Sequence, residues 1–224
     1  MTSPLRLGIA GLGTVGVGIV RIVQNHAALL EQRAGRPIVV TAVSARSKGK
    51  NRDVDVSAYE WEDDPALLAK REDVDVFIEV MGGHEGPAKD ATEAAIAAGK
   101  DVVSANKALL AIHGQTLAEA AEAANRVIRF EAAVAGGIPV VKALTEGLAG
   151  NDINRVMGVM NGSCNYILTR MQDAGLSYEA VFDEANQLGY LEADPELDVG
   201  GIDAGHKLAL VSSIAFGTQV DFGA

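Results

Sequence analysis

The chain has 224 residues, of which 48% are hydrophobic and 22% are charged, and its formal net charge is −11. This length accommodates one full domain and part of another, and the hydrophobic fraction excludes a disordered chain. A nucleic-acid partner is not expected, because neutralising phosphates needs a basic surface. The N-terminus lacks the pattern of a signal peptide, and no stretch approaches the roughly 20 apolar residues that span a membrane. We therefore expect a cytoplasmic protein without a membrane partner.

Short apolar runs alternate with longer helical stretches over the first half of the chain. Strands are predicted at residues 5–10, 38–44, 74–80, 101–104 and 127–130. Helices are predicted at residues 15–30, 87–98 and 115–125. This alternation indicates an α/β fold in which a doubly wound parallel sheet is built with right-handed crossovers.

The pattern changes after Glu131. A linker of small residues at 132–137 precedes Pro139, which suits the first turn of a helix. A strand is then predicted at 154–160, followed by helices at 165–174, 178–188 and 202–216, with a carboxylate-rich loop at 192–198. We predict two domains, over residues 1–133 and 134–224.

A glycine motif, GLGTVG at Gly11–Gly16, joins the first predicted strand to the first predicted helix. Gly11 permits a tight turn, Gly13 lets the backbone approach a pyrophosphate, and Gly16 permits close packing of helix on strand. The N-terminus of the helix then offers unpaired N–H groups to phosphate oxygens. Three glycines at this spacing are a weak signal alone, but the strand and helix around them predict a Rossmann-type dinucleotide-binding domain.

The end of the second predicted strand bears on the choice of cofactor. An acid there would bind the ribose 2′-hydroxyl of NAD, but none is present. Four cations lie close together instead, at Arg46, Lys48, Lys50 and Arg52. This cluster favours the 2′-phosphate of NADP, with a solvated basic loop as the alternative.

Carboxylates and a lysine are concentrated between Glu192 and Lys207. A calcium loop that starts at Asp194 fails, because Val199 occupies the position that needs glycine and Gly205 the position that needs glutamate. Asp203 and Lys207 are four residues apart, so they share a face of an apolar helix. A lysine beside a carboxylate is a candidate proton donor or acceptor, and the spacing leaves a surface salt bridge equally open.

The remaining candidate residues carry weaker signals. Lys107 follows the end of a predicted strand, where ligands bind in open α/β sheets, although it also suits an ordinary helix start. Cys164, the single cysteine, excludes a disulfide within the chain and is interpreted as a small buried residue rather than a nucleophile. The histidines lack metal-ligand spacing and are interpreted as structural or solvated: His26, His84, His113 and His206.

Six stretches that together span nearly the whole chain resemble the N-terminal and central part of homoserine dehydrogenase, in the order of that family. They are GLGTVG, IEVMGG at Ile78–Gly83, SANKALLA at Ser104–Ala111, EAAVAGGIP at Glu131–Pro139, NGSCNYIL at Asn161–Leu168 and GYLEADPELDVGGIDAGHK at Gly189–Lys207. The resemblance implies the NAD(P)-dependent interconversion of L-homoserine and L-aspartate 4-semialdehyde, a step in the biosynthesis of threonine, methionine and isoleucine.

The resemblance also implies roles for individual residues. The lysine that matches Lys207 exchanges a proton with the substrate oxygen, Lys107 lies at the active site, and Asp198 is a further active-site acid. The residues implied in substrate binding are Glu192, whose carboxylate suits the ammonium group of homoserine, Asp203, Tyr190, Gly162 and Ser163. The residues expected to contact the cofactor are Gly11, Gly13, Thr14, Val15, Gly16, Arg46, Lys48, Gly82, Ser104, Lys107 and Gly189. A monovalent cation, sodium, is expected at Glu131 and the backbone carbonyls of Val134, Gly136 and Ile138.

Two departures from the family pattern are present. The family motif NGTTN is here NGSCN, with Ser163 and Cys164 in place of the two threonines. The chain also stops at Ala224, which implies a truncated form with an incomplete substrate and dimerisation domain. A homodimer is expected for a full-length form, while the activity and dimerisation of these residues alone stay open. The alternative is a catalytically inactive NADP-binding fragment. An aspartate-semialdehyde dehydrogenase would need a base beside Cys164, and none is visible.

Overall fold

The computed structural model describes residues 2–191 and 195–223. Its contacts divide the chain into two compact units, Met1–Val140 and Val141–Ala224. We keep the division at residues 133/134 as a prediction for the limit of the nucleotide-binding domain. Within the described residues, no helix is long and apolar enough to cross a membrane.

The first unit is built on a six-stranded sheet whose strand order is β3-β2-β1-β4-β5-β6. Its strands are β1 (Leu5–Ala10), β2 (Ile38–Ser44), β3 (Glu60–Trp61), β4 (Val76–Glu79), β5 (Asp101–Ser104) and β6 (Ile128–Arg129). All of their pairings are parallel. The order runs outward in both directions from β1 and β4, so the switch point of the sheet lies between these two strands. The predicted doubly wound α/β fold is confirmed.

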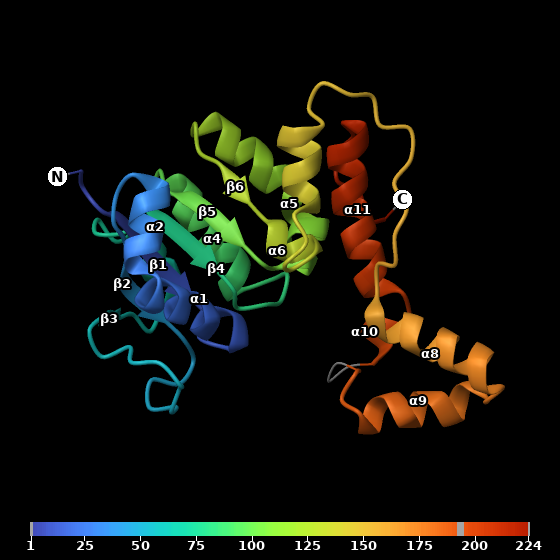
Figure 1. The fold of residues 1–224 in the computed structure, drawn as a ribbon. Helices are drawn as coiled ribbons and strands as arrows, with labels where there is room; N and C mark the ends of the chain where they lie inside the picture. Colours follow the sequence, from blue (N-terminus) through green and yellow to red (C-terminus); the bar gives the residue numbers. More distant parts are fainter. Residues whose placement is uncertain (1, 192–194, 224) are drawn as a thin grey trace. The chain divides into compact units, whose positions relative to one another are not determined.

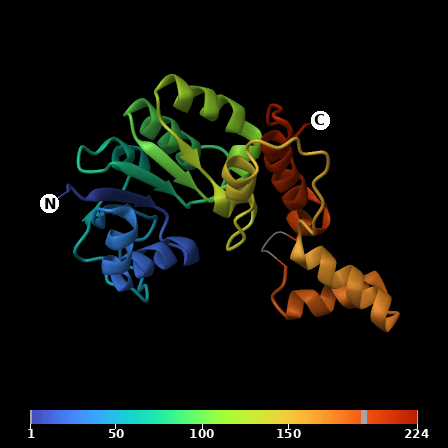
Figure 2. The same cartoon turned by 45° about the horizontal axis from the view of Figure 1, so that its top comes forward.

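Helices cover both faces of this sheet (Figures 1 and 2). They are α1 (Thr14–Asn25), α2 (Ala27–Ala34), α3 (Pro65–Lys70), α4 (Pro87–Ala97), α5 (Lys107–Ala123) and α6 (Glu131–Val134). The helices α1 and α2 contact β2 on one face, whereas α4 packs against α3 and α5 on the other. A core of aliphatic side chains, which includes the fully buried Ile9, Val20 and Val43, fills the space between α1 and the central strands.

The second unit is helical. Its elements are α7 (Val140–Lys142), the π-helix η1 (Ala143–Gly147), α8 (Gly162–Ala174), α9 (Tyr178–Gln187), α10 (Glu196–Val199) and α11 (Ile202–Phe216). The helices α8 and α9 pack through Ile167, Val181 and Ala185, all of which are buried. The Ser177 hydroxyl accepts a hydrogen bond from the Ala180 amide and caps α9, as its position before the helix predicts.

Several elements differ from those predicted. The helix predicted at 15–30 is two helices that meet at His26. The strand predicted at 154–160 is wrong: the segment is not a strand and pairs with none in the described chain, and its Met157 and Val159 are 79% and 72% exposed. The alternation of apolar and polar residues favours a strand, but a strand forms only beside a partner. The unpredicted elements are short: β3, α3, α6 and α10.

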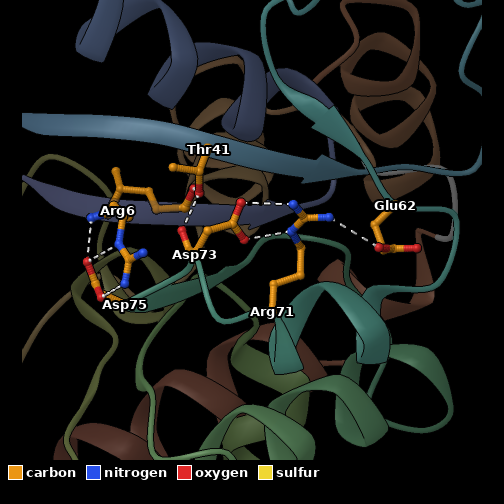
Figure 3. Close-up of polar contacts among 7 residues, drawn as sticks. Arg6, Thr41, Glu62, Arg71, Asp73 and Asp75 are labelled. Atoms are coloured by element: carbon orange, nitrogen blue, oxygen red, sulfur yellow. Dashed lines mark hydrogen bonds and ion pairs between the residues drawn. The ribbon is translucent and has the colours of Figure 1, made fainter.

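Two arginine–aspartate pairs lie near the starts of β1 and β4 (Figure 3). One joins Arg6 of β1 to Asp75 directly before β4, and the other lies within the segment after α3. Arg6 donates to Asp75 from its backbone amide at 2.9 Å and from its guanidinium Nε and Nη2 at 3.0 and 2.7 Å. Arg71 donates from Nε and Nη2 to the two oxygens of Asp73, both at 2.8 Å. Thr41 of β2 adds a hydrogen bond to the Asp73 carbonyl. The Arg6–Asp75 pair joins β1 to the start of β4 at the amino-terminal edge of the sheet, and the Thr41 hydrogen bond joins β2 to the same segment.

The Arg6–Asp75 pair predicts an acid-sensitive contribution to stability. The hydrogen bonds from Arg6 hold the pKa of the Asp75 carboxyl below its usual value. A lowered pKa in the folded state stabilises the fold above the unfolded pKa of about 3.9, and this stabilisation is lost as the pH falls through the folded pKa. Urea unfolding between about pH 6 and pH 2 should therefore show a smaller acid-induced loss of stability for Asp75→Asn than for the wild type. Equal losses in the two proteins would contradict this prediction.

Candidate active site

The turn between β1 and α1 has the shape that binding a pyrophosphate requires. Gly11 has a φ of +104°, and a Cβ there would lie 2.4 Å from the Val80 carbonyl oxygen. A Cβ at Gly16 would lie 1.9 Å from the Gly11 carbonyl oxygen, so both positions need glycine. By contrast, a Cβ at Gly13 would meet nothing within 4 Å, and no side chain among the described residues caps α1 there. Phosphate oxygens can therefore approach the N–H groups of the first helical turn.

A buried carboxylate shapes the adjacent loop at the carboxyl end of β4. Glu79 is fully buried, and its Oε1 accepts hydrogen bonds from the amides of Met81 and Gly82 at 2.8 and 3.3 Å. Its Oε2 accepts a hydrogen bond from the Ser104 hydroxyl at 2.7 Å. Ser104 in turn accepts from the Asn106 amide at 3.0 Å. One carboxylate thus fixes both the loop after β4 and the segment after β5.

Asn106 extends this network to the helix that begins with Lys107. Its side-chain amide donates to the Gly83 carbonyl at 2.6 Å, and its Oδ1 accepts from the Leu109 amide at 3.1 Å, which caps α5. Lys107, Ser104 and Gly82 therefore lie at or directly after the carboxyl ends of the neighbouring strands β4 and β5, and their contacts with a cofactor stay a prediction. Glu79 and Asn106 were not among the predicted site residues. Their signals were an acid within an apolar strand and an asparagine directly before a helix.

The basic loop after β2 is tied to the glycine turn by Arg52. The guanidinium of Arg52 donates to the carbonyls of Leu12, Lys50 and Ser47 at 3.3, 3.0 and 2.8 Å. It also lies 5.5 Å from the centre of the Trp61 ring, and the Lys48 ammonium lies 5.8 Å from it. Arg52 therefore shapes the loop, while Arg46, Lys48 and Lys50 are exposed to solvent.

Lys207 and Asp203 form a shielded ion pair in the second unit. The Lys207 ammonium donates to Asp203 Oδ2 at 2.7 Å and to the Met160 carbonyl at 3.0 Å. Asp203 is buried, and the side chain of Lys207 is 22% exposed. Of the two alternatives that the spacing left open, the surface salt bridge is therefore wrong. The ammonium is held in a fixed position with limited access to water.

Asn161 joins this pair to Asp198. Its side-chain Nδ2 donates to Asp198 Oδ1 at 2.8 Å and to Asp203 Oδ2 at 3.0 Å, and both carboxylates are buried. Its Oδ1 accepts from the Cys164 amide at 2.7 Å and so caps α8. A single amide therefore bridges two carboxylates beside the lysine. Asn161 was not among the predicted site residues and stood only within the NGSCN motif, although an asparagine directly before a helix is a capping signal.

Other predicted substrate residues lie at the start of α8 and after α9. The Ser163 hydroxyl donates to the Tyr190 carbonyl at 2.6 Å, and the Tyr190 ring packs edge-on against Tyr166. Gly162 begins α8, and Gly189 precedes Tyr190 with a φ of +73°. Glu192 lies outside the described residues.

Cys164 has the environment of a structural cysteine. Its thiol donates a hydrogen bond to the Asp198 carbonyl at 3.2 Å. Burial raises the pKa of this thiol, and the negative charges of Asp198 and Asp203 raise it further. A raised pKa disfavours the thiolate, which is the nucleophilic form. The geometry thus agrees with the interpretation that Cys164 is not a nucleophile, but the residue is only partly buried and not fully buried as predicted.

The segment predicted to hold a monovalent cation begins with Glu131 at the start of α6. After Val134, the chain turns through Gly137, whose φ is +82°, and the Ile138 carbonyl accepts from the Val140 amide at 2.8 Å. In the part of the chain that the structure describes, no group of three or more His, Cys, Asp or Glu side chains is placed to hold a metal ion. The predicted site uses mainly backbone carbonyls, and it stays a prediction.

The parallel sheet with its switch point, together with the glycine turn beside it, defines the first unit as a Rossmann-type NAD(P)-binding domain. Residues 11–131 match the family model described as "Homoserine dehydrogenase, NAD binding domain", and residues 139–224 match the model "Homoserine dehydrogenase". The chain belongs to the homoserine dehydrogenase family.

Individual relatives agree with this assignment. A homoserine dehydrogenase from Neisseria gonorrhoeae is 46% identical over 222 residues, which is 99% of this chain and 51% of that protein. One from Mycobacterium tuberculosis is 46% identical over 218 residues, which is 97% of this chain and 49% of that protein. The chain thus spans about half the length of these curated relatives.

Solved structures are similar as well. The crystal structure of a homoserine dehydrogenase from Thiobacillus denitrificans superposes with a TM-score of 0.92 at 42% identity, covering 98% of this chain and 51% of that one. A hyperthermophilic archaeal homoserine dehydrogenase, solved in complex with NADPH, gives a TM-score of 0.82 at 28% identity, covering 97% of this chain and 71% of that one.

Proposed function

We propose that this chain carries the homoserine dehydrogenase reaction, the NAD(P)-dependent interconversion of L-homoserine and L-aspartate 4-semialdehyde. The observation that carries the proposal is the buried cluster in which Lys207 is anchored by Asp203 and Asn161 links Asp203 to Asp198. Family membership alone would not assign chemistry to particular side chains. A fixed lysine among buried carboxylates offers a proton-transfer group for a small polar substrate.

Oxidation of an alcohol removes a hydride and a proton from the substrate. The nicotinamide, when bound, supplies the hydride acceptor. Lys207 is assigned to proton transfer. Its amine accepts the hydroxyl proton during oxidation, and its ammonium returns a proton to the carbonyl oxygen during reduction. Asp203 and the Met160 carbonyl hold Nζ in place for both directions. Lys107 is assigned to the cofactor edge, because it begins α5 directly after Asn106, which caps that helix. Glu192 is assigned to the ammonium group of homoserine.

The test of this proposal is homoserine-dependent reduction of NADP by the purified chain, followed by the absorbance of the reduced nicotinamide. Omission of homoserine and the variant Lys207→Ala are the controls. Turnover that both controls abolish supports the proposal. An absence of turnover in a chain that still binds NADP would contradict the proposal for this chain.

That outcome would favour a second candidate, a catalytically inactive NADP-binding module. The observation in its favour is that the unit Met1–Val140 has its own six-stranded sheet, its own buried core and the glycine turn. Such a unit can bind a dinucleotide whether or not the residues around Lys207 are functional. The module would bind NADP with an affinity that does not change on addition of homoserine.

NADP is proposed as the preferred cofactor, with NAD as a substitute, because residues 45–52 directly after β2 include four cations and no acid. We expect the double substitution of Arg46 and Lys48 by glutamine to weaken NADP binding by at least about tenfold, since charge-assisted hydrogen bonds are worth about 1.5–3 kcal/mol each. NAD binding should change little. Calorimetric titration with NADP and with NAD measures this difference, and Arg33→Gln, which removes an exposed arginine of α2 outside this cluster, is the control. Equal weakening of both cofactors would contradict the assignment.

Three further features are proposed on the family assignment. They are a sodium ion held by Glu131 and the backbone carbonyls of Val134, Gly136 and Ile138, homodimerisation of a longer form of the chain, and a cytoplasmic location in amino-acid biosynthesis. Each is separable from the chemistry at Lys207. A dependence of cofactor binding on sodium but not on lithium would support the cation site.

A further inference from the structure

A polar cavity of roughly 460 Å³ lies at the edge of the sheet where β1, β4 and β5 begin. The strands are parallel, so this edge is opposite to the one that carries the glycine turn, Ser104 and Lys107. All of the lining residues belong to the first unit. They are Ser3, Pro4, Leu5, Arg6, Arg36, Asp75, Val76, Gly99, Lys100, Asp101 and Arg126.

The charged groups of this lining do not balance. Four of its residues are cations and two are carboxylates, within a chain whose net charge is −11. One cation and one carboxylate neutralise each other, because Arg6 and Asp75 form the bidentate pair shown in Figure 3. The other carboxylate, Asp101, accepts a hydrogen bond from the Val127 amide at 3.1 Å. The cavity therefore has an excess of positive charge in an acidic protein.

The cations outside the bidentate pair are Arg36, Lys100 and Arg126, and Asp101 offsets one of their three charges. Within residues 2–191 and 195–223, none of these three side chains makes a hydrogen bond or a close ion pair with another protein group, although the charge of Lys100 also acts on Asp75. Among the described residues, the buried Nε atom of Arg126 has no hydrogen-bond acceptor, which is unfavourable for a guanidinium N–H. The same guanidinium belongs to a residue that lines the cavity, so its charge is available to an anion that binds there.

We propose that this cavity is a binding site for a small phosphate-bearing anion, separate from the dinucleotide edge. Arginine guanidinium groups match phosphate oxygens in geometry as well as in charge, and three cations around one space suit a group with several negative oxygens. The volume lies in the range of small-molecule sites. The site does not depend on the function proposed for Lys207, because it lies at the other edge of the first unit's sheet from the glycine turn.

The test is calorimetric titration of the full chain with inorganic pyrophosphate at low ionic strength. The wild type is expected to bind one pyrophosphate, and Arg126→Gln should weaken that binding at least tenfold. Arg126→Lys, which keeps the charge, should retain part of the affinity. Arg33→Gln is the matched control, because it removes an exposed arginine of α2 that does not line the cavity. Lys100→Gln is the second variant if Arg126→Gln fails to fold.

The outcomes separate the proposed cavity from the glycine turn, which can also attract pyrophosphate. Binding that Arg126→Gln and Lys100→Gln leave unchanged belongs to the glycine turn and would overturn the proposal. Citrate that binds as tightly as pyrophosphate would overturn the phosphate assignment, and an absence of saturable binding would overturn the site itself. Loss of binding in the cavity variants with full binding by Arg33→Gln supports it, whether or not the chain oxidises homoserine.

Discussion

Lys207→Met is expected to lower kcat for homoserine oxidation by about 10²- to 10⁴-fold, because it removes the group assigned to proton transfer. Methionine has a similar length and no proton to exchange, so it perturbs packing less than alanine. NADP affinity should be unchanged, since the glycine turn belongs to the other unit. The measurements are initial rates of NADPH formation and a separate titration with NADP.

The control for this prediction is Lys207→Arg. Arginine keeps the positive charge beside Asp203, but its guanidinium stays protonated in proteins and does not act as the base. Lys207→Arg should therefore preserve stability while remaining slow, whereas Lys207→Met should also lose stability because it leaves Asp203 with an uncompensated buried charge. Near wild-type turnover of the arginine variant would show that Lys207 acts only through its charge.

Asn161→Asp is expected to lower the free energy of unfolding by about 2–5 kcal/mol at pH 7, because it adds a charge to a buried site that already holds two carboxylates. The new carboxylate can still accept the Cys164 amide and cap α8, so the loss comes from the added charge and from the missing amide donors to Asp198 and Asp203, not from the cap. Its two like-charged neighbours raise the pKa of the new group in the folded state. Stability should then recover as the pH falls from about 7 to 5.

Asn161→Ser is the matched variant. Serine also caps helices but brings no charge, so its loss of stability should be smaller, about 1–3 kcal/mol, and nearly independent of pH over the same range. Urea unfolding of both variants and the wild type at pH 7 and pH 5 provides the comparison. If both variants lose the same amount at both pH values, Asn161 acts only as a helix cap and the bridge between the carboxylates has no energetic role.

The sequence predicted those elements whose signals are local. The strands β1, β2 and β5 and the helix α11 coincide with the predicted ranges, because the apolar pattern that predicts each of them lies within its own segment. The strand β3 was missed because its two residues are defined by pairing with Ala42 and Val43, far away in sequence. The strand predicted at 154–160 failed for the same physical reason: the described chain supplies no partner for it.

In the candidate site, too, local features could be predicted from the sequence, whereas contacts between distant segments could not. The spacing of Asp203 and Lys207 placed them on one helix face, but it did not establish that the pair is shielded, because burial depends on segments distant in sequence. Asn161 lies 37 and 42 residues from the two carboxylates that it joins. Glu79 lies 25 residues from Ser104. Such networks become visible only when the chain is folded.

The contacts of Arg52 have a consequence for engineering the cofactor preference. One way to redesign the preference from NADP to NAD would be to replace the whole cationic segment after β2, residues 46–52. Here that exchange would also remove the contact between Arg52 and the Leu12 carbonyl within the glycine turn. A graft that brings in an acid at position 46 while it retains Arg52 and Trp61 alters the ribose subsite and leaves the support of the pyrophosphate subsite in place. The two subsites can be redesigned independently only while Arg52 is kept.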